Sequence, residues 1–332
     1  MSKMKAIILD AKPASRDAIR NHLTVKDDVT VPEIKSDEVL VRVEATGLNI
    51  EDIMIACGWR FGTALTATKE NPLIPGQEFS GTIEKLGSKV KGWSVGDPVL
   101  AHKLPLRVKC GSWAEFVSIS ASSLVRKPDS YTWAQAAAIP MQCQVAHEPI
   151  KVAGFSKLPV LDVLPHKSLT PEMIELAEDK TLIMVKGTDM DKVKEIKVAV
   201  VGASSTTGLM VTDMLVSRGV SVIGVCSAAS APTVLANGAL AVLDRNQGGL
   251  ESRPEGIKLE VVIDCVGGQE VEDASRAALG NKGHFVTAAG PGDDSFCPEI
   301  DTVKGLMGLV WDASSRSFKV LSVTLYVFYN LN

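Results

Sequence analysis

Residues Val198–Gly208 read VAVVGASSTTG, a continuous apolar run followed by a turn of glycine and hydroxyl residues. Where a buried strand runs through a glycine turn into a helix, backbone N–H groups at the start of the helix can bind a diphosphate. Gly202 can form the tight turn and Gly208 can let the helix pack close to the strand, whereas the middle fingerprint glycine is replaced by Ser205. The serine adds a Cβ where the phosphate approaches, and a hydroxyl that could bond to it. We therefore expect a phosphate-binding turn, with a turn that binds nothing as the alternative, made by Gly202, Ser204, Ser205, Thr206, Thr207 and Gly208.

The residues after the second apolar run bear on which dinucleotide such a turn would take. An NAD site carries an acidic residue there, about 20 residues past the glycine turn, to bond the ribose 2′-hydroxyl. Val225–Pro232 reads VCSAASAP and contains no Asp or Glu, so the 2′-phosphate of NADPH would meet no negative charge. No Lys or Arg occurs between Arg218 and Arg245, however, and only Ser227 and Ser230 offer neutral donors. We expect NADPH as the cofactor, with Ser227 beside its ribose.

These residues need a scaffold, and the second half of the chain predicts one. Its continuous apolar runs alternate with helical spacing, as in GLMVTDMLVSRG and PTVLANGA, which is typical of a parallel sheet covered on both faces. We predict a doubly wound domain over residues 196–332. Ligands bind at the carboxyl ends of the strands in such sheets. Three more candidate cofactor residues therefore follow later strands: Val266, Ala289 and Gly290.

The first half of the chain, residues 1–150, has the pattern of short strands broken by turns. Runs such as KMKAIILDA and EVLVRVEATGL, together with closely spaced glycines, predict a small barrel or sandwich. Between the halves, residues 151–195 carry several prolines and the charged piece TPEMIELAEDKTLIMVKG. Thr170-Pro171-Glu172 fits a helix N-cap, a first-position proline and an acidic first turn. We predict an inserted, helix-containing connection there.

Composition narrows the classes of protein to consider. The 332 residues carry a net charge of −4, which leaves no basic excess for nucleic acid. No apolar run approaches the 18 residues of a membrane span, and the start MSKMKAIILDAK lacks a signal-peptide core. The six cysteines are scattered singly without a CxxC pair, which favours a reducing compartment. We expect a cytoplasmic protein, with a mitochondrial or plastid location left open.

In its order of segments the chain resembles the medium-chain dehydrogenase/reductase superfamily, in the zinc-free branch of quinone oxidoreductases and enoyl reductases. The resemblance implies an α/β protein with a GroES-like β-barrel domain, a Rossmann domain, and a cofactor in the cleft between them. The segments that carry it cover most of residues 1–150 and 196–330: EVLVRVEATGLNIEDIMIACG, PLIPGQEFSGTIEKLGSKVKGWSVGDPV, GSWAEFVSISASSLVRKPDSYTWAQAAAIP, VAVVGASSTTGLMVTDMLVSRGVSVIGVCS and VVIDCVGG.

Two positions of this pattern bear on a catalytic metal. Alcohol dehydrogenases of the superfamily place Cys where this chain has Asn49 and His where it has Gln77. Neither Asn nor Gln supplies the thiolate or imidazole that holds catalytic zinc. We therefore expect no metal. Reduction of an activated double bond or quinone suits a zinc-free site, because it needs only a positioned hydride donor and stabilisation of a developing oxyanion.

The resemblance also assigns roles to individual residues. It places Asn49 near the nicotinamide as the catalytic residue, where its amide could donate to the substrate carbonyl. Gln142 falls in the segment that runs under the nicotinamide, so it joins the cofactor-binding candidates. The tyrosine that family reductases often carry shortly after Asn49 is missing, and Asp52 is a weak alternative proton donor.

The favoured interpretation is a zinc-independent, NADPH-dependent reductase of a small-molecule enone, enoyl compound or quinone. The alternative is a non-catalytic relative that serves as a scaffold or accessory subunit of a larger complex, which the altered glycine turn and the missing tyrosine would suit. The run Val320–Tyr329 predicts a last strand that could pair across a homodimer axis.

Overall fold

The structure is a computed structural model that describes residues 2–14, 18–57, 67–103, 110–161, 168–177, 181–281, 283–288, 309–312 and 317–320. The described residues up to Met141 form one compact unit, and those from Gln142 onward form a second. Each unit has its own sheets and its own core. Among the described residues, no helix has both the length and the apolar character needed to cross a membrane.

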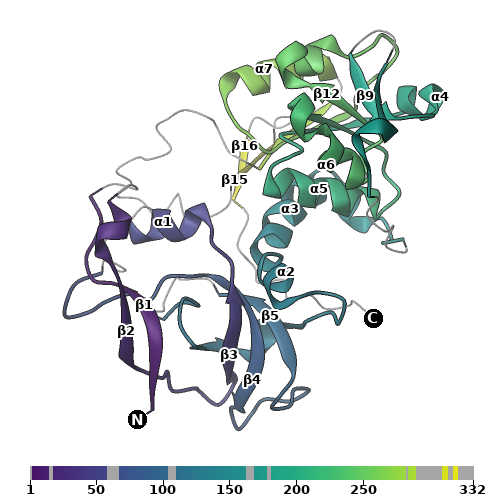
Figure 1. Cartoon of the computed structure of the whole chain (residues 1–332). Coiled ribbons are helices and arrows are strands. Elements are labelled where there is room, and N and C mark those ends of the chain that lie inside the picture. Colours follow the sequence, from purple (N-terminus) through teal and green to yellow (C-terminus); the bar gives the residue numbers. More distant parts are fainter. Residues whose placement is uncertain are drawn as a thin grey trace. The chain divides into compact units, whose positions relative to one another are not determined.

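The first unit is β-rich, as its short alternating runs predict (Figure 1). A two-stranded sheet pairs β1 (Lys3–Leu9) with β2 (Leu23–Thr30). A five-stranded antiparallel sheet has the order β6-β3-β4-β5-β7. Its strands are β3 (Glu38–Thr46), β4 (Glu78–Leu86), β5 (Pro98–His102), β6 (Phe116–Ser120) and β7 (Leu124–Arg126).

Alternate residues of these strands point into one apolar core, which includes Val39, Val41, Phe79 and Ile83. This is the burial pattern expected of strands with period-two alternation. The helices of the unit are short: η1 (Ile19–His22), α1 (Ile50–Ala56), η4 (Ala121–Ser123) and α2 (Trp133–Ala137). Helix α3 (Pro140–Val152) follows, and its residues from Gln142 onward belong to the second unit.

The second unit contains a nine-stranded sheet in the order β16-β15-β14-β13-β10-β11-β12-β9-β8. Its five central strands are parallel, which confirms the predicted doubly wound sheet. They are β10 (Val198–Val201), β11 (Val222–Cys226), β12 (Ala241–Asp244), β13 (Val261–Asp264) and β14 (His284–Thr287). The register places Val201 beside both Val225 and Asp264, so the carboxyl ends of β10, β11 and β13 lie together.

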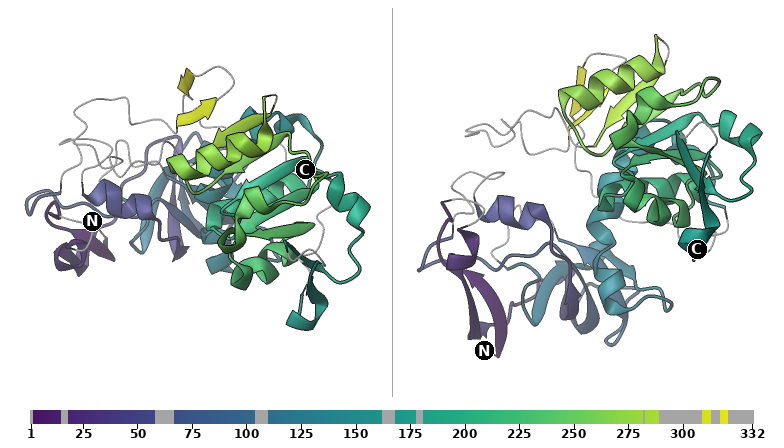
Figure 2. Two further views of the ribbon diagram at one scale, coloured as in Figure 1. Left: turned by 90° about the horizontal axis from the view of Figure 1, so that it is seen from above. Right: turned by 45° about the horizontal axis from the view of Figure 1, so that its top comes forward.

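Two apolar clusters show that helices cover both faces of this sheet (Figure 2). Val198 and Val200 pack on one face with α3, α5 (Thr206–Val216) and α6 (Ala231–Ala236). Ala199 and Val201 face the other way, toward α4 (Met190–Lys194) and α7 (Gln269–Leu279). Burial on both faces explains why these strands are apolar throughout rather than alternating.

The helix predicted from Thr170 is wrong. After one short 3-10 turn, η6 (Pro171–Met173), the chain forms a hairpin of β8 (Ile174–Leu176) and β9 (Leu182–Val185). β9 pairs antiparallel with β12, and its Leu182 and Met184 are buried while Ile183 and Val185 are only half-buried. This segment pairs with the open edge of the parallel sheet because the pairing buries its alternate apolar side chains. The stabilisation from that burial outweighs the local preference for a helix.

At the opposite edge, β15 (Leu309–Asp312) pairs antiparallel with β14, and β16 (Ser317–Val320) pairs antiparallel with β15. The predicted dimer strand Val320–Tyr329 begins at the last residue of β16 and otherwise lies outside the described residues, so the dimer remains a prediction.

Candidate active site

The glycine turn after β10 has the close contacts that its two glycines permit. Gly202 has φ +73°, and a Cβ there would lie 2.5 Å from Cγ2 of Val266. A Cβ on Gly208 would lie 2.2 Å from the carbonyl oxygen of Gly202. Both positions therefore exclude a side chain, one for the turn and one for the approach of α5 to the strand.

Ser205 does not need to be glycine. Its backbone is extended, with φ −70° and ψ 161°, and it is the N-cap residue of α5. Its Oγ accepts a hydrogen bond of 3.0 Å from the N–H of Gly208, as N-cap serines usually do. The hydroxyl hydrogen can still be donated outward. Within the described part of the chain, the N–H groups of Thr206 and Thr207 have no protein acceptor, as expected in a first helical turn.

Gln142 and Thr207, predicted separately, are brought together. Thr207 Oγ1 donates to Gln142 Oε1 over 3.1 Å, which ties the first turn of α5 to α3. Ser204 lies in the same turn and is half-buried.

A charged side chain from the neighbouring strand β12 contacts the loop after β11, although that loop contains no charged residue of its own. Ser227 Oγ and Ser230 Oγ are hydrogen-bonded to each other at 3.0 Å. Parallel pairing sets Cys226 beside Asp244, and the Asp244 carboxylate accepts from the N–H of Ala228 at 3.3 Å. Arg245, the next residue, is exposed.

The charges of Asp244 and Arg245 also affect Cys226, the last residue of β11. The pKa of the Cys226 thiol is raised to about 11, chiefly by burial and also by the charge of Asp244, while the charge of Arg245 opposes the rise. An acidic and a basic side chain therefore lie near the end of β11, which itself contains no charged residue.

The loop after β13 is held by Asp264, which is 1% exposed. Its carboxylate accepts from the N–H groups of Val266 and Gly267 and from the Thr287 hydroxyl, at 2.8 to 3.1 Å. Val266 is thereby held with 55% of its surface exposed, beside Gly202. Ala289 and Gly290, the other predicted residues of this edge, lie outside the described residues.

In the first unit, Asn49 lies in a network of buried carboxylates. Its Nδ2 donates to Oε1 of Glu78 over 2.7 Å, and Glu78 Oε2 accepts from the N–H of Met141 over 2.9 Å. Glu78 is 2% exposed. Burial raises the pKa of its carboxyl, and the two hydrogen bonds oppose that rise because they favour the charged form.

Asp52 is the second buried carboxyl, at 3% exposure rather than on the surface. It accepts from the Asn49 backbone N–H at 2.9 Å, one half of a capping box for α1, and from Gln77 Nε2 at 3.3 Å. Burial raises the pKa of Asp52 to about 6, with smaller upward contributions from the charges of Glu78 and Glu51.

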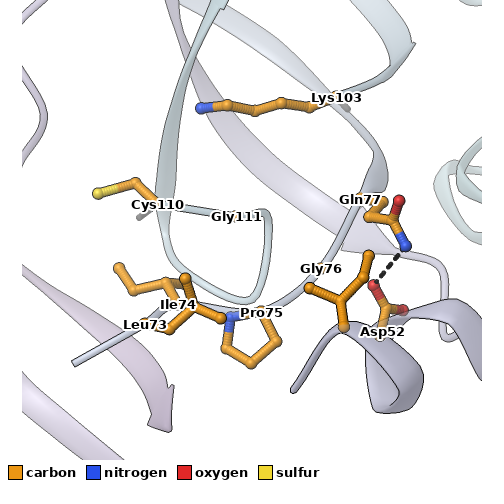
Figure 3. A pocket seen from close by; sticks show the side chains of 10 residues that line it. Asp52, Leu73, Ile74, Pro75, Gly76, Gln77, Lys103, Cys110 and Gly111 are labelled. Carbon is orange, nitrogen blue, oxygen red and sulfur yellow. Dashed lines mark hydrogen bonds between the residues drawn. The ribbon is translucent and has the colours of Figure 1, made fainter. Parts of the chain in front are cut away.

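A cavity of about 20 Å³ lies next to this network, lined by Asp52, Gln77, Lys103 and apolar side chains such as Ile74 (Figure 3). It has room for about one water molecule and is far too small for a nicotinamide or an enone. Lys103 is buried, its Nζ donates to the Ser118 carbonyl over 2.6 Å, and burial lowers its pKa to about 8. This cavity is therefore not the substrate site.

Comparison with known proteins agrees with this architecture. Residues 35–129 match the family model of the alcohol dehydrogenase GroES-like domain. The chain is 29% identical over 245 residues to a mitochondrial NAD(P)H oxidoreductase, RTN4IP1, of Danio rerio, which is 70% of this chain and 54% of that protein. A quinone oxidoreductase structure from Coxiella burnetii superposes with a TM-score of 0.59 at 20% identity, covering 86% of this chain and 75% of that one. Residues 35–129 thus match an alcohol dehydrogenase GroES-like domain, and the chain as a whole shares its fold with the quinone oxidoreductase.

The chain is also 34% identical over 138 residues to the 2-methylene-furan-3-one reductase of Solanum lycopersicum. That match covers 40% of this chain and 34% of the tomato protein. The chain thus spans about a third to about half of the length of these two curated relatives. The predicted fold class, a GroES-like domain with a Rossmann domain, is confirmed.

At the two positions where alcohol dehydrogenases are expected to hold zinc, this chain carries amides that face carboxylates. Asn49 Nδ2 points to Glu78 and Gln77 Nε2 points to Asp52. An amide N–H donates a hydrogen bond and offers no lone pair to a cation. In the described ranges of the chain, no three His, Cys, Asp or Glu side chains group as metal ligands would.

Sequence reasoning missed Glu78, Asp244 and Arg245. Glu78 carried a usable signal, because it interrupts an otherwise uncharged segment, PGQEFSG, at the start of a buried strand. Asp244 and Arg245 carried none, since their position beside β11 follows only from the pairing of β11 with β12.

Proposed function

We propose that this protein is a zinc-independent, NADPH-dependent reductase of an activated double bond or a quinone. The observation that carries the proposal is the turn from β10 into α5. Two glycines there have no room for a Cβ, and the N–H groups of Thr206 and Thr207 lack protein acceptors among the described residues. A diphosphate fits the donors of such a helix N-terminus.

Ser205 fits the same role with a hydroxyl in place of the missing glycine. Its Oγ is already fixed by the Gly208 N–H, so its O–H can donate to a phosphate oxygen without further ordering. Gln142, Thr207 and Val266 would hold the rest of the dinucleotide, and Ala289 and Gly290 stay predictions for the same edge.

NADPH is the proposed cofactor because Arg245 stands near the end of β11 with the hydroxyls of Ser227 and Ser230. Asp244 would repel a 2′-phosphate, but its carboxylate is held by the N–H groups of Ala228 and Asn246. A guanidinium and two hydroxyls suit a phosphate well. The Danio rerio relative is named for NAD(P)H, which agrees with a nicotinamide cofactor.

On the substrate side we propose Asn49 as the catalytic residue. A bound reduced nicotinamide would supply a hydride to the β-carbon of an enone or to a quinone and be oxidised, and water would supply the proton that completes the product. Asn49 would donate a hydrogen bond to the carbonyl oxygen, which gains negative charge as the hydride arrives. The amide–carboxylate pairs at Asn49 and Gln77 support a site without zinc. The tomato relative is named as a reductase of an enone, which is why enones lead the substrate list.

The test is a fluorescence titration with NADPH and NADH, followed by NADPH oxidation with an alkenal, a cyclic enone and a quinone. We expect NADPH to bind more tightly than NADH. Arg245→Ala should raise the Kd for NADPH by about 10- to 100-fold, the loss of a charged hydrogen bond, and leave that for NADH within about twofold. Arg276→Ala, which removes a surface arginine paired with Glu272, is the matched control.

Absence of NADPH binding at millimolar cofactor would reject the reductase and favour the non-catalytic scaffold. Stoichiometric zinc in the purified protein would reject the zinc-free mechanism.

A further inference from the structure

Glu78 is a buried carboxylate that the proposed chemistry does not itself use. It begins β4, and its two oxygens accept from two different segments, Asn49 Nδ2 at 2.7 Å and Met141 N–H at 2.9 Å. Met141 lies in the first turn of α3, so the carboxylate also caps that helix. Each of the two carboxylate oxygens therefore has a partner, and the side chain cannot rotate without losing a bond.

The surroundings of Glu78 leave it no second position. A Cβ on Gly47 would lie 2.2 Å from Glu78 Oε1 and 2.6 Å from its Cγ, so the carboxylate occupies the space that this glycine leaves open. The Glu78 carbonyl oxygen is fixed as well, by the Gly47 N–H at 3.0 Å and the Thr46 hydroxyl at 2.9 Å. The fold thus places a rigid acceptor, 29 residues away in sequence, against the side chain of Asn49.

An ionised carboxylate only accepts hydrogen bonds, so it discriminates between the two ends of an amide. Asn49 must turn its Nδ2 toward Glu78 and its Oδ1 away. We propose that Glu78 is a positioning residue that fixes the orientation of the Asn49 amide for the reduction. This inference rests on the proposed function, because it takes Asn49 as the group that meets the substrate carbonyl.

Glu78→Gln gives a sharp test, because the glutamine can keep both contacts only if Asn49 reverses. The Met141 N–H needs an acceptor, so it should take the Gln oxygen. The Gln Nε2 would then face Asn49, whose amide must turn by a half-circle to accept with Oδ1. The Glu78→Gln variant should therefore keep the fold, but the Nδ2 of Asn49 would no longer point toward residue 78. We expect kcat to fall by about 100- to 1000-fold, as when one oxyanion donor is removed, with KM for NADPH within about twofold.

Two further variants separate positioning from general damage. Asn49→Asp combined with Glu78→Gln restores a donor facing an acceptor but leaves no donor at residue 49, so it should be as stable as the wild type and as slow as Glu78→Gln. Glu115→Gln alters another carboxylate that accepts a backbone N–H in the same unit, from Lys5 at 2.7 Å. It should leave kcat unchanged.

A second readout does not depend on activity. With selective ¹⁵N-asparagine labelling, the Asn49 side-chain amide protons should exchange slowly in the wild type, and their signals should shift in Glu78→Gln. If the wild type reduces none of the test substrates, the proposed function fails, and these signals alone then decide whether Glu78 orients Asn49. Unchanged Asn49 signals in Glu78→Gln, or a kcat within twofold of wild type in an active enzyme, would overturn the positioning role.

Discussion

Asp52 makes the stability of the first unit depend on pH, and the size of the effect can be worked out. Its pKa is raised from 3.8 to about 6, chiefly because the folded chain buries the carboxyl. Between these values the folded protein keeps a proton that the unfolded chain releases. Stability contributed by the proton is therefore complete below pH 3.8 and is lost as the pH rises through 6. At about 1.4 kcal/mol per pKa unit, the loss amounts to about 3 kcal/mol.

Asp52→Asn removes this titration. The asparagine can accept from only one of the two donors, the Asn49 N–H and Gln77 Nε2, and that costs about 1 kcal/mol at every pH. The quantity to compare is thus the change between pH 4 and pH 8, not the stability at one pH. Wild type should lose about 2.5 kcal/mol more than the variant across that range, because at pH 4 the unfolded chain has already released part of its proton.

Urea unfolding at unit steps of pH, followed by a probe within the first unit, measures this difference. Asp27→Asn, which alters an exposed aspartate of β2, serves as the control and should follow the wild-type pH profile. If wild type and Asp52→Asn differ by a constant amount from pH 4 to pH 8, the burial of a charged carboxyl is not what governs this site, and the reasoning fails.

Three further predictions concern single side chains. Gly208→Ala should destabilise the second unit by about 2 kcal/mol in thermal or urea unfolding, because a Cβ 2.2 Å from the Gly202 carbonyl outweighs the better helix propensity of alanine; an unchanged midpoint would contradict the packing. Ser205→Ala should cost about 1 kcal/mol of stability and Ser205→Gly only a few tenths, measured in the same way, and equal losses would show that the cap is not what Ser205 contributes. Burial lowers the pKa of Lys103 to about 8 from 10.5, so the folded protein releases a proton that the unfolded chain keeps, and stability should rise between pH 8 and pH 10.5. Lys103→Met should abolish that rise in pH-dependent unfolding, whereas a rise that persists would assign it to another group.

The elements around the glycine turn could be predicted because their signals are local. A strand buried on both faces must be apolar throughout. The spacing of Gly202 and Gly208 is typical of a tight turn that joins a strand to a closely packed helix. The segment from Thr170 could not be predicted in the same way. Its proline and acidic first turn favour a helix, but the free edge of β12 decides that Leu182 and Met184 are buried as a strand.

The sequence by itself determined the parallel sheet, the turn after β10 and the replacement of zinc-type ligands by Asn49 and Gln77, because each depends on residue type and short spacing. Only the tertiary structure decided what surrounds those residues. Glu78 reaches Asn49 across 29 positions and Met141 across 63, and Asp244, next to Arg245, comes beside Cys226 through the pairing of two strands. Such contacts are set by how distant segments pack, and burial then fixes which carboxyls resist ionisation, so no local pattern records them.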